Sequence, residues 1–259
     1  MVSRPDAACA ADHGSGGHCQ PPGRKHFGTI TCRVSNVTII TPLAHEATKL
    51  AAVLRPYGLS PIISGPGPAA VTACVLAQLA DPQGPPKLII LAGLAGGLKP
   101  AGPLPPCGWG TMIFGPENTK VRGRAKSLVA CTWPAVRISS VQEPLCLPEQ
   151  KRDLSGENDA DFVDTESYWF AQACADNDVP WAVIRAVSDD RDEILPPAVL
   201  GWTLPNGQTN YGRVLKDMLR HPSLVNKSIK LGKKATTAMK LISKELERVL
   251  PHLATKVKR

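Results

Sequence analysis

Aromatic residues are scarce in this chain of 259 residues, and long apolar runs are absent from it. Phe, Trp and Tyr together make up 5% of the residues, so we expect a core built mainly from aliphatic side chains. No run approaches the roughly 18 consecutive apolar residues that a membrane-spanning helix needs. No apolar segment of the signal-peptide kind stands near the N-terminus either. These absences favour a cytoplasmic protein.

The chain has eight cysteines, but no two of them have the spacing of a metal-binding or redox motif. No two of them form a C-x-x-C pair, and several lie in apolar context, where a free cysteine behaves as a small hydrophobic residue. The N-terminal segment carries His13, His18, Cys19 and His26, but their spacing fits no standard zinc pattern. We therefore expect reduced cysteines, no metal site and no bound cofactor.

The net charge of +8 is concentrated at the C-terminal end. From Arg213 to Arg259 there are 13 Lys and Arg against three acids, a balance of +10, which leaves 8 − 10 = −2 for the rest. A basic amphipathic helix can lie on an anionic membrane. Alternatively, a solvated helix packs its apolar stripe on the domain; that stripe is Met239, Ile242, Leu246, Val249 and Leu250. Nucleic-acid binding is not favoured, because the segment almost lacks aromatic residues and has no recognition motif.

The chain divides into a polar N-terminal part and a patterned remainder. Residues 1–35 are glycine-rich and show no period, so we expect a disordered extension there. In 36–259, short apolar runs alternate with helical patterns, which is typical of an α/β fold. The sheet is expected to be mainly parallel or mixed, and the domain is expected to end in a basic helical segment. Strands are expected at 37–41, 87–92 and 181–187, and helices at 45–55, 68–80 and 165–177.

Acidic residues and a glycine-rich stretch accompany the predicted strand ends. Glu46 comes after the first strand, Gly93–Gly97 after the second and Asp189 after the last. Glu166 opens the helix that precedes that last strand. Ligands of open α/β sheets bind beyond the carboxyl ends of the strands, so these groups are expected to converge. Each signal also has a plainer explanation, because an acid at a helix start is commonly a dipole partner or cap. The residues alone therefore indicate an α/β enzyme and no substrate.

Several segments between Val37 and Glu193 together resemble a known superfamily. They are Ile39–Ala47, Ser64–Gly67, Leu88–Leu98, Val163–Ser167 and Val179–Asp189. In these segments the chain resembles the nucleoside phosphorylase and methylthioadenosine/S-adenosylhomocysteine nucleosidase superfamily. The resemblance implies a phosphorylase/hydrolase-like fold, which is a single-domain three-layer α/β/α sandwich with a central mixed sheet. Further segments are similar to hopanoid-associated phosphorylases, which are thought to remove adenine from adenosylhopane; these are Pro148–Arg152, Asp161–Ser167, Asp192–Pro197 and Tyr211–Leu215.

The resemblance implies two catalytic carboxylates. Asp189 would protonate or hydrogen-bond the N7 atom of a purine, and Ser188 would orient it. Glu46 would act as the base for an attacking water molecule. Relatives of this kind are usually dimers or larger, so the resemblance also implies a homo-oligomer.

The resemblance assigns binding roles to the remaining candidates. Glu166, with Thr165 beside it, would accept hydrogen bonds from the ribose hydroxyls. A glycine-rich loop would hold the nucleophile or the base with its backbone amides; it consists of Gly93, Leu94, Ala95 and Gly96. In the last strand, Arg185 is expected to be a structural partner of a carboxylate.

Departures from the superfamily pattern bear on the reaction. Leu94 stands where phosphorylases carry a phosphate-binding serine, and we expect no arginine near Glu46 or beside the glycine-rich loop. Water is therefore favoured over phosphate as the nucleophile. The aromatic residue that stacks on the purine is not evident around 142–145.

The hypothesis from the sequence is an enzyme that cleaves a purine N-ribosidic bond. The favoured reaction is release of adenine from adenosylhopane in hopanoid biosynthesis. Packing of the basic C-terminal helix on the domain is the preferred interpretation, and a peripheral membrane contact through this helix is the alternative that would suit a lipid substrate. One alternative is a nucleosidase or phosphorylase for a small nucleoside such as methylthioadenosine or S-adenosylhomocysteine. Another is a non-catalytic ligand-binding protein of the same fold. A lipid substrate requires an open apolar channel beyond the ribose 5′ position, which a sequence does not display.

Overall fold

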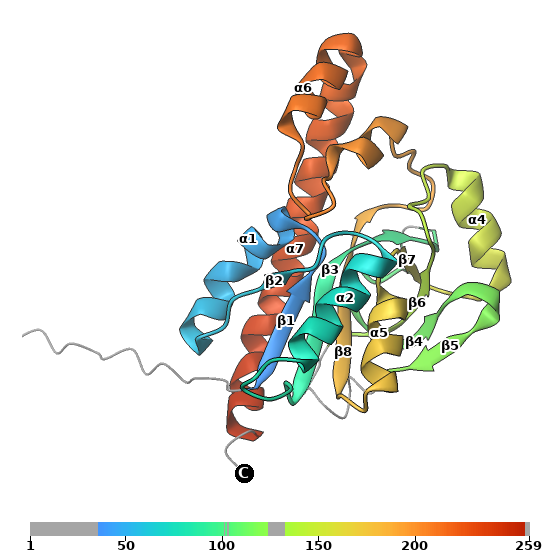
Figure 1. The fold of residues 1–259 in the computed structure, drawn as a ribbon. Coiled ribbons are helices and arrows are strands. Elements are labelled where there is room, and N and C mark those ends of the chain that lie inside the picture. The colour runs from blue at the N-terminus through green and yellow to red at the C-terminus, as the bar shows by residue number, and fades with distance from the viewer. Residues whose placement is uncertain (1–35, 101, 103, 124–132, 257–259) are drawn as a thin grey trace, which may run out of the picture. The chain divides into compact units, whose positions relative to one another are not determined.

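The computed structural model describes residues 36–100, 102, 104–123 and 133–256. The disordered extension predicted over 1–35 lies outside these residues, as do the histidines and the cysteine considered as metal ligands there. The described part has the predicted α/β architecture, in which a central sheet is covered by helices (Figure 1).

In the described part, eight strands form one mixed sheet, which confirms the predicted sheet type. The strands are β1 (Val37–Thr41), β2 (Ile62–Ile63), β3 (Leu88–Gly97), β4 (Cys107–Phe114), β5 (Lys120–Arg122), β6 (Ala135–Ser140), β7 (Phe162–Asp164) and β8 (Trp181–Asp189). Their order is β2-β1-β3-β7-β6-β4-β5, and β8 pairs with both β3 and β4. Strands β1, β3 and β8 are parallel, whereas β7 is antiparallel to β3.

The strand pairings close into a ring that the sequence did not indicate. Strand β3 pairs with β7, β7 with β6, β6 with β4 and β4 with β8, which returns to β3. The ring closes because β3 is long: its first residues pair with β1, and its last residues, Gly96 and Gly97, pair with β7. The carboxyl end of β3 therefore lies between β7 and β8, where the candidate site is built.

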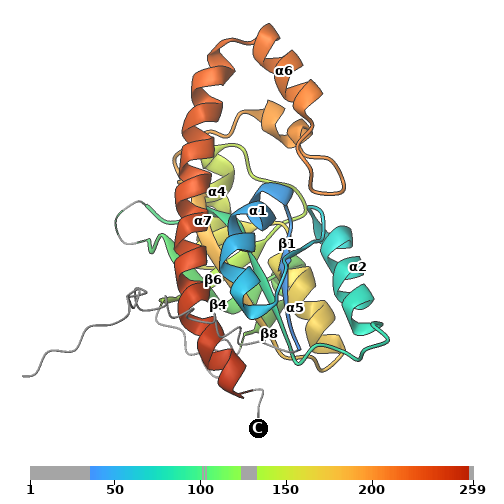
Figure 2. The same cartoon turned by 90° about the vertical axis from the view of Figure 1, so that its left-hand side faces the viewer.

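Helices cover both faces of the sheet and give the predicted three layers (Figure 2). Helices α1 (Ala44–Leu54) and α7 (Ser223–Lys256) pack on one face. Helices α2 (Pro68–Leu79) and α5 (Ser167–Asp176) pack on the other. Both cores are mainly aliphatic, as the low aromatic content predicted, because branched apolar side chains fill most of the space between the layers.

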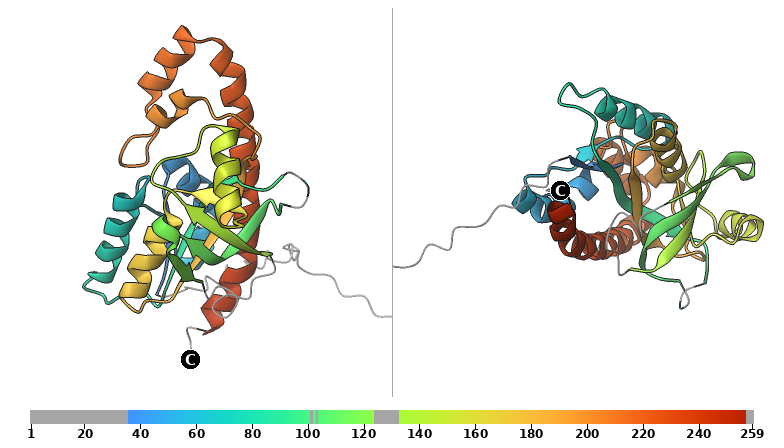
Figure 3. Two further views of the ribbon diagram at one scale, coloured as in Figure 1. Left: turned by 90° about the vertical axis from the view of Figure 1, so that its right-hand side faces the viewer. Right: turned by 90° about the horizontal axis from the view of Figure 1, so that it is seen from below.

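The basic C-terminal segment divides into a packed part and an exposed part. The apolar stripe of α7, from Met239 to Leu250, is buried in the core on the α1 face, so this stripe packs on the domain. Helix α6 (Tyr211–Arg220) precedes α7 and has no buried residue. Figure 3 shows α6 beside the first turns of α7, away from the central strands.

The remaining helical elements are short and lie in the connections. They are α4 (Pro148–Glu157) and the 3₁₀ helices η1 (Arg55–Tyr57), η2 (Pro116–Asn118) and η3 (Pro197–Trp202). Within the described ranges, no helix is both long and apolar enough to cross a membrane.

Candidate active site

Glu46 is buried at the start of α1 and bonded at both carboxylate oxygens. Its Oε2 accepts a hydrogen bond from the backbone N–H of Leu43 at 3.0 Å, so the residue caps its own helix. Its Oε1 accepts from the backbone N–H of Leu94 in β3 at 2.8 Å. Burial raises the pKa of Glu46 to about 7, against the opposing effect of the nearby Arg185 guanidinium. Capping and a chemical role are therefore compatible in this side chain.

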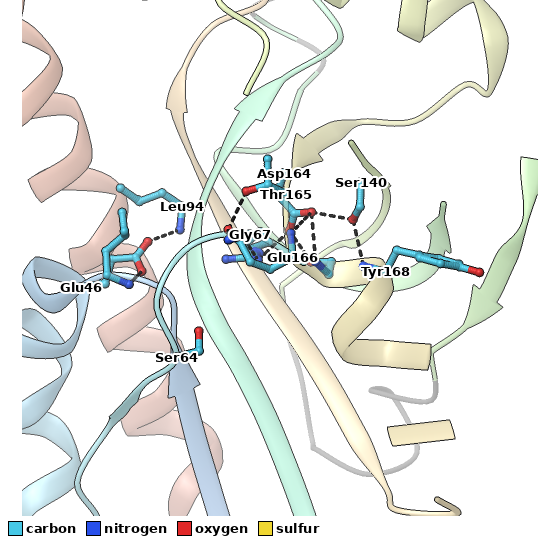
Figure 4. A network of polar contacts seen from close by, with 12 residues as sticks. Glu46, Ser64, Gly67, Leu94, Ser140, Asp164, Thr165, Glu166 and Tyr168 are labelled. Atoms are coloured by element: carbon cyan, nitrogen blue, oxygen red, sulfur yellow. Dashed lines mark hydrogen bonds and ion pairs between the residues drawn. The ribbon is translucent and has the colours of Figure 1, made fainter. Parts of the chain in front are cut away.

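Arg185 lies fully buried at the centre of the acidic cluster (Figure 4 shows the surrounding contacts). Its guanidinium forms ion pairs with Asp164 at 2.7 Å and with Glu166 at 3.1 Å. Its Nε donates to the hydroxyl of Ser167 at 3.2 Å. The expectation that Arg185 pairs with carboxylates therefore agrees with its contacts.

The expectation that no arginine stands near Glu46 or the glycine-rich stretch is wrong. Gly93 pairs with Arg185 in the β3–β8 ladder. A Cβ atom at Gly93 would collide with Nη1 of Arg185 and lie 2.9 Å from Oε1 of Glu46. Among the described residues, that Nη1 has no hydrogen-bond partner. Glycine at this position thus lets a buried carboxylate and an unsatisfied guanidinium N–H approach each other across the strand.

The prediction that Gly93, Leu94, Ala95 and Gly96 form a loop is also wrong, because these residues continue strand β3. Their backbone pairs with β8 over most of this length and with β7 at Gly96. The amide of Leu94 is already donated to Glu46. The glycines serve close packing instead: a Cβ atom at Gly96 would lie 3.1 Å from Oδ2 of Asp189.

Glu166 and Thr165 lie together where β7 leads into α5. Oε1 of Glu166 accepts from the hydroxyl of Thr165 at 2.5 Å and from the backbone N–H of Gly67 at 2.9 Å. Burial raises the pKa of Glu166, and the Arg185 charge opposes this rise. Asp164 accepts from the Ser140 hydroxyl at 2.6 Å and binds Ser167, which fixes the start of α5. Asp164 is thus a structural group.

Asp189 ends strand β8 and is held by two side chains. The hydroxyl of Ser188 donates to its Oδ1 at 2.7 Å. The ammonium group of Lys151, from α4, forms a buried ion pair with its Oδ2 and also donates to the backbone carbonyl of Asp190 at 2.9 Å. An ionised carboxylate accepts hydrogen bonds and donates none.

Lys151 is the contact residue that the sequence did not reveal. It lies in Pro148–Arg152, which carried part of the family resemblance, yet a lysine in a short polar helix is normally exposed to solvent. In the structure Lys151 is buried, with its ammonium group bonded to Asp189 and Asp190 at the end of β8.

One small cavity of about 140 Å³ gathers most of the candidate residues. It is lined by Leu94, Ala95, Gly96, Lys151, Thr165, Glu166, Ser188 and Asp189, together with Asp164, Val141, Pro144, Leu145, Val163 and Leu195. Glu46 and Gly93 do not line it, but they adjoin it through Leu94. The wall near 141–145 is aliphatic, in line with the missing aromatic residue. The separate sequence signals therefore converge on one site.

A larger cavity of about 460 Å³ adjoins the small one and shares Leu94, Ser188, Asp189 and Leu195 with it. Its lining comes from α1, η3 and α7 and is largely apolar; it includes Val199, Trp202, Leu231, Ala235 and Met239. His45 also lines it, and burial lowers the pKa of that imidazole. Within the described chain, no group of three or more His, Cys, Asp and Glu residues is arranged to hold a metal ion.

Solved structures share this fold. The 5′-methylthioadenosine/S-adenosylhomocysteine nucleosidase of Helicobacter pylori matches 84% of this chain and 100% of its own, with a TM-score of 0.57 and 16% identity. Futalosine hydrolase of Helicobacter pylori strain 26695 matches 83% and 99%, with a TM-score of 0.57 and 15% identity. The corresponding Campylobacter jejuni nucleosidase matches 83% and 99%, with a TM-score of 0.55 and 14% identity.

Sequence comparisons add no closer relative. No protein-family model matches the chain, and no curated protein matches it. The structural comparisons therefore establish a class of fold, the one found in nucleosidases of this type, in agreement with the resemblance that the motifs carry.

Proposed function

We propose that this protein is a nucleosidase that cleaves a purine N-ribosidic bond with water as the nucleophile. The observation that carries the proposal is the single cavity that brings Glu166 and Thr165 together with Ser188 and Asp189. A nucleosidase needs a group that holds the ribose hydroxyls and another that contacts the leaving base, and these two pairs fill those roles. The nucleosidase fold supports the same assignment.

The charges of the site fit the chemistry of this reaction. N-glycosidic cleavage passes through an oxocarbenium-like sugar, much as O-glycoside hydrolysis does. Three carboxylates, those of Glu46, Asp164 and Glu166, surround the single guanidinium of Arg185. An excess of negative charge stabilises a cationic sugar and repels a phosphate dianion. The positive charge of Arg185 is already offset by the two acids that pair with it, so it attracts a phosphate dianion weakly, and water is the preferred nucleophile.

Glu46 is the proposed base for that water. A general base works best when its pKa is close to the working pH, and the pKa of Glu46 is about 7. The unsatisfied Nη1 of Arg185 faces it across Gly93 and can donate a hydrogen bond to a water molecule or a ribose hydroxyl. The role of the 93–96 stretch is then steric, because a side chain at Gly93 would fill the space between Glu46 and Nη1 of Arg185.

We propose that the nucleoside carries a large apolar group, with adenosylhopane as the favoured substrate. The support is the 460 Å³ apolar cavity that shares four lining residues with the small site. A methylthio group would fill little of this volume, and a polycyclic lipid would use it. A small nucleoside such as methylthioadenosine is the alternative that the experiment below tests.

We place the proposed membrane contact on α6 and not on the apolar stripe of α7. Tyr211, Leu215 and Leu219 recur every four residues, and their side chains are 78%, 60% and 73% exposed. Lys216 and Arg220 lie on the same helix, and Lys227 and Lys230 follow at the start of α7. Apolar and basic residues in this arrangement suit an anionic lipid surface. A second copy of the chain would bring like charges together. The homo-oligomer stays a prediction.

The proposal is tested by chromatographic measurement of adenine released from adenosylhopane and from methylthioadenosine, each with and without phosphate. We expect release from the lipid without phosphate. Glu166→Gln should lower the rate about 100-fold or more, because it removes charge that faces the developing cation. Glu149→Gln, an exposed acid on α4, is the matched control. A phosphate requirement would overturn the choice of water, and absence of adenine from both substrates would overturn the purine assignment.

A further inference from the structure

Lys151 occupies an unusual position for a lysine. Its side chain is buried and lines the small cavity. Among the described lining residues, Lys151 is the single positively charged one. Its ammonium group binds Asp189 and the backbone carbonyl of Asp190. A lysine loses hydration when it is buried and is tolerated only where it is paired. Its pairing explains why the fold accepts it, and its place in the cavity wall puts a proton donor at the site.

The ion pair also changes what Asp189 can contribute. The proposed reaction requires a hydrogen bond or a proton at the departing base, because the electron pair of the broken C1′–N bond moves into that base. Asp189 in the pair is an acceptor, and the Ser188 hydroxyl is already directed at its Oδ1. The donor that remains at this end of the cavity is the ammonium group of Lys151.

We propose that Lys151 donates the proton to the leaving base, and that Asp189 is the acceptor beside it. This rests on the proposed nucleosidase function. In the step, water adds to C1′ and gives a proton to Glu46, the C1′–N9 bond breaks, and its electron pair passes into the purine. Lys151 supplies a proton to N7, and the proton on Glu46 returns to Lys151 through solvent after the products leave. Water and nucleoside thus give free ribosyl product and neutral base.

A leaving-group experiment isolates the role of Lys151. Two substrates are compared: the adenine nucleoside that the wild type cleaves, and 4-nitrophenyl β-ribofuranoside, whose phenolate departs without a proton. We expect Lys151→Met to lower cleavage of the nucleoside about 10²- to 10⁴-fold and cleavage of the nitrophenyl riboside by about tenfold at most. Lys151→Arg keeps the charge beside Asp189 and so guards against misfolding, but a guanidinium does not release its proton. Lys151→Arg should therefore also lose much more activity on the nucleoside than on the nitrophenyl riboside. Lys240→Met, an exposed lysine on α7, is the control.

The outcomes separate this inference from the proposed function. A wild type that cleaves neither substrate overturns the nucleosidase assignment itself. An active wild type overturns the Lys151 proposal if a folded Lys151→Arg or Lys151→Met enzyme keeps full nucleoside activity, or if both substrates lose activity equally.

Discussion

At the scale of single residues, the site is an arrangement of buried charges around two basic groups. Arg185 is shared between Asp164 and Glu166, and Lys151 is paired with Asp189. Buried charges that lack partners are strongly destabilising. Each acid therefore depends on a neighbour for its burial, and this dependence lets the protein keep several ionisable groups in one small cavity.

Glu46 provides a prediction at this scale that pH can test. If Glu46 is the base, it must be ionised, so kcat/KM should rise with pH and level off above about 7. Glu46→Gln should lower kcat/KM by a factor of about 100 or more. A pH–rate profile of the wild type checks the first point, and an acid limb that lies well below this range would contradict it.

The same pKa has a consequence for stability whose sign is fixed. Between about 4.5 and about 7, the folded protein holds a proton on Glu46 that the unfolded chain releases. The free energy of unfolding therefore loses the contribution of Glu46 as pH rises through this window. Thermal melting of the wild type and of Glu46→Gln should show a steeper decline with pH in the wild type. Glu149→Gln serves as the control, because this exposed acid should leave the decline unchanged.

At the scale of elements, β3 and α6 carry the features that matter most for function. Strand β3 continues through its glycines, because β8 and β7 satisfy its backbone on both sides. Helix α6 contributes an exposed apolar face next to η3, whose Val199 and Trp202 line the larger cavity. An apolar substrate bound in that cavity would thus contact η3, and η3 in turn contacts α6, the helix of the proposed membrane contact.

Helix α6 gives a prediction at the scale of elements. The double variant Leu215→Ser and Leu219→Ser should bind anionic vesicles less than the wild type in a flotation assay, because it removes apolar area from the exposed face. Its melting temperature should change little, since both side chains are mostly exposed. Leu76→Ser, an exposed leucine on α2, is the matched control. Equal flotation of all three proteins, or no wild-type binding at low salt, would contradict membrane contact through α6.

At the scale of the whole molecule, α7 is part of the fold and not an appendage. Its apolar stripe lies in the same core as β1, β3 and α1. In addition, the indole N–H of Trp109 in β4 donates to Glu245 of α7 at 2.7 Å, in a buried contact. The helix that carries most of the positive charge therefore also supports the strands that form the site.

This packing predicts a large effect from one truncation. Leu246→Ala should lower the free energy of unfolding by about 2 to 5 kcal/mol, because it leaves a cavity in a fully buried position. Denaturant titration measures the change. Leu76→Ala, at an exposed leucine, should cost far less. A loss below about 1 kcal/mol at Leu246 would show that α7 is only loosely attached.

The sequence by itself determined the α/β class, because apolar runs and helical periods are local properties of the chain. The three layers and the mixed sheet were implied by the family resemblance of its motifs. The sequence also placed Glu46, Glu166 and Asp189 next to strand and helix ends, and parallel strands bring such ends to one edge. The burial of the α7 stripe followed from the same kind of pattern. The catalytic roles of the acids stay predictions.

Only the tertiary structure decided how these groups are partnered. The position of Arg185 beside Glu46 depends on the β3–β8 register, and the burial of Lys151 depends on where α4 packs; neither is encoded in local spacing. The glycine-rich stretch read as a loop is a strand, because β7 arrives antiparallel at its end and completes its hydrogen bonds. Contacts of this kind join residues far apart in the chain, so the electrostatics of the site follow from packing and not from sequence pattern.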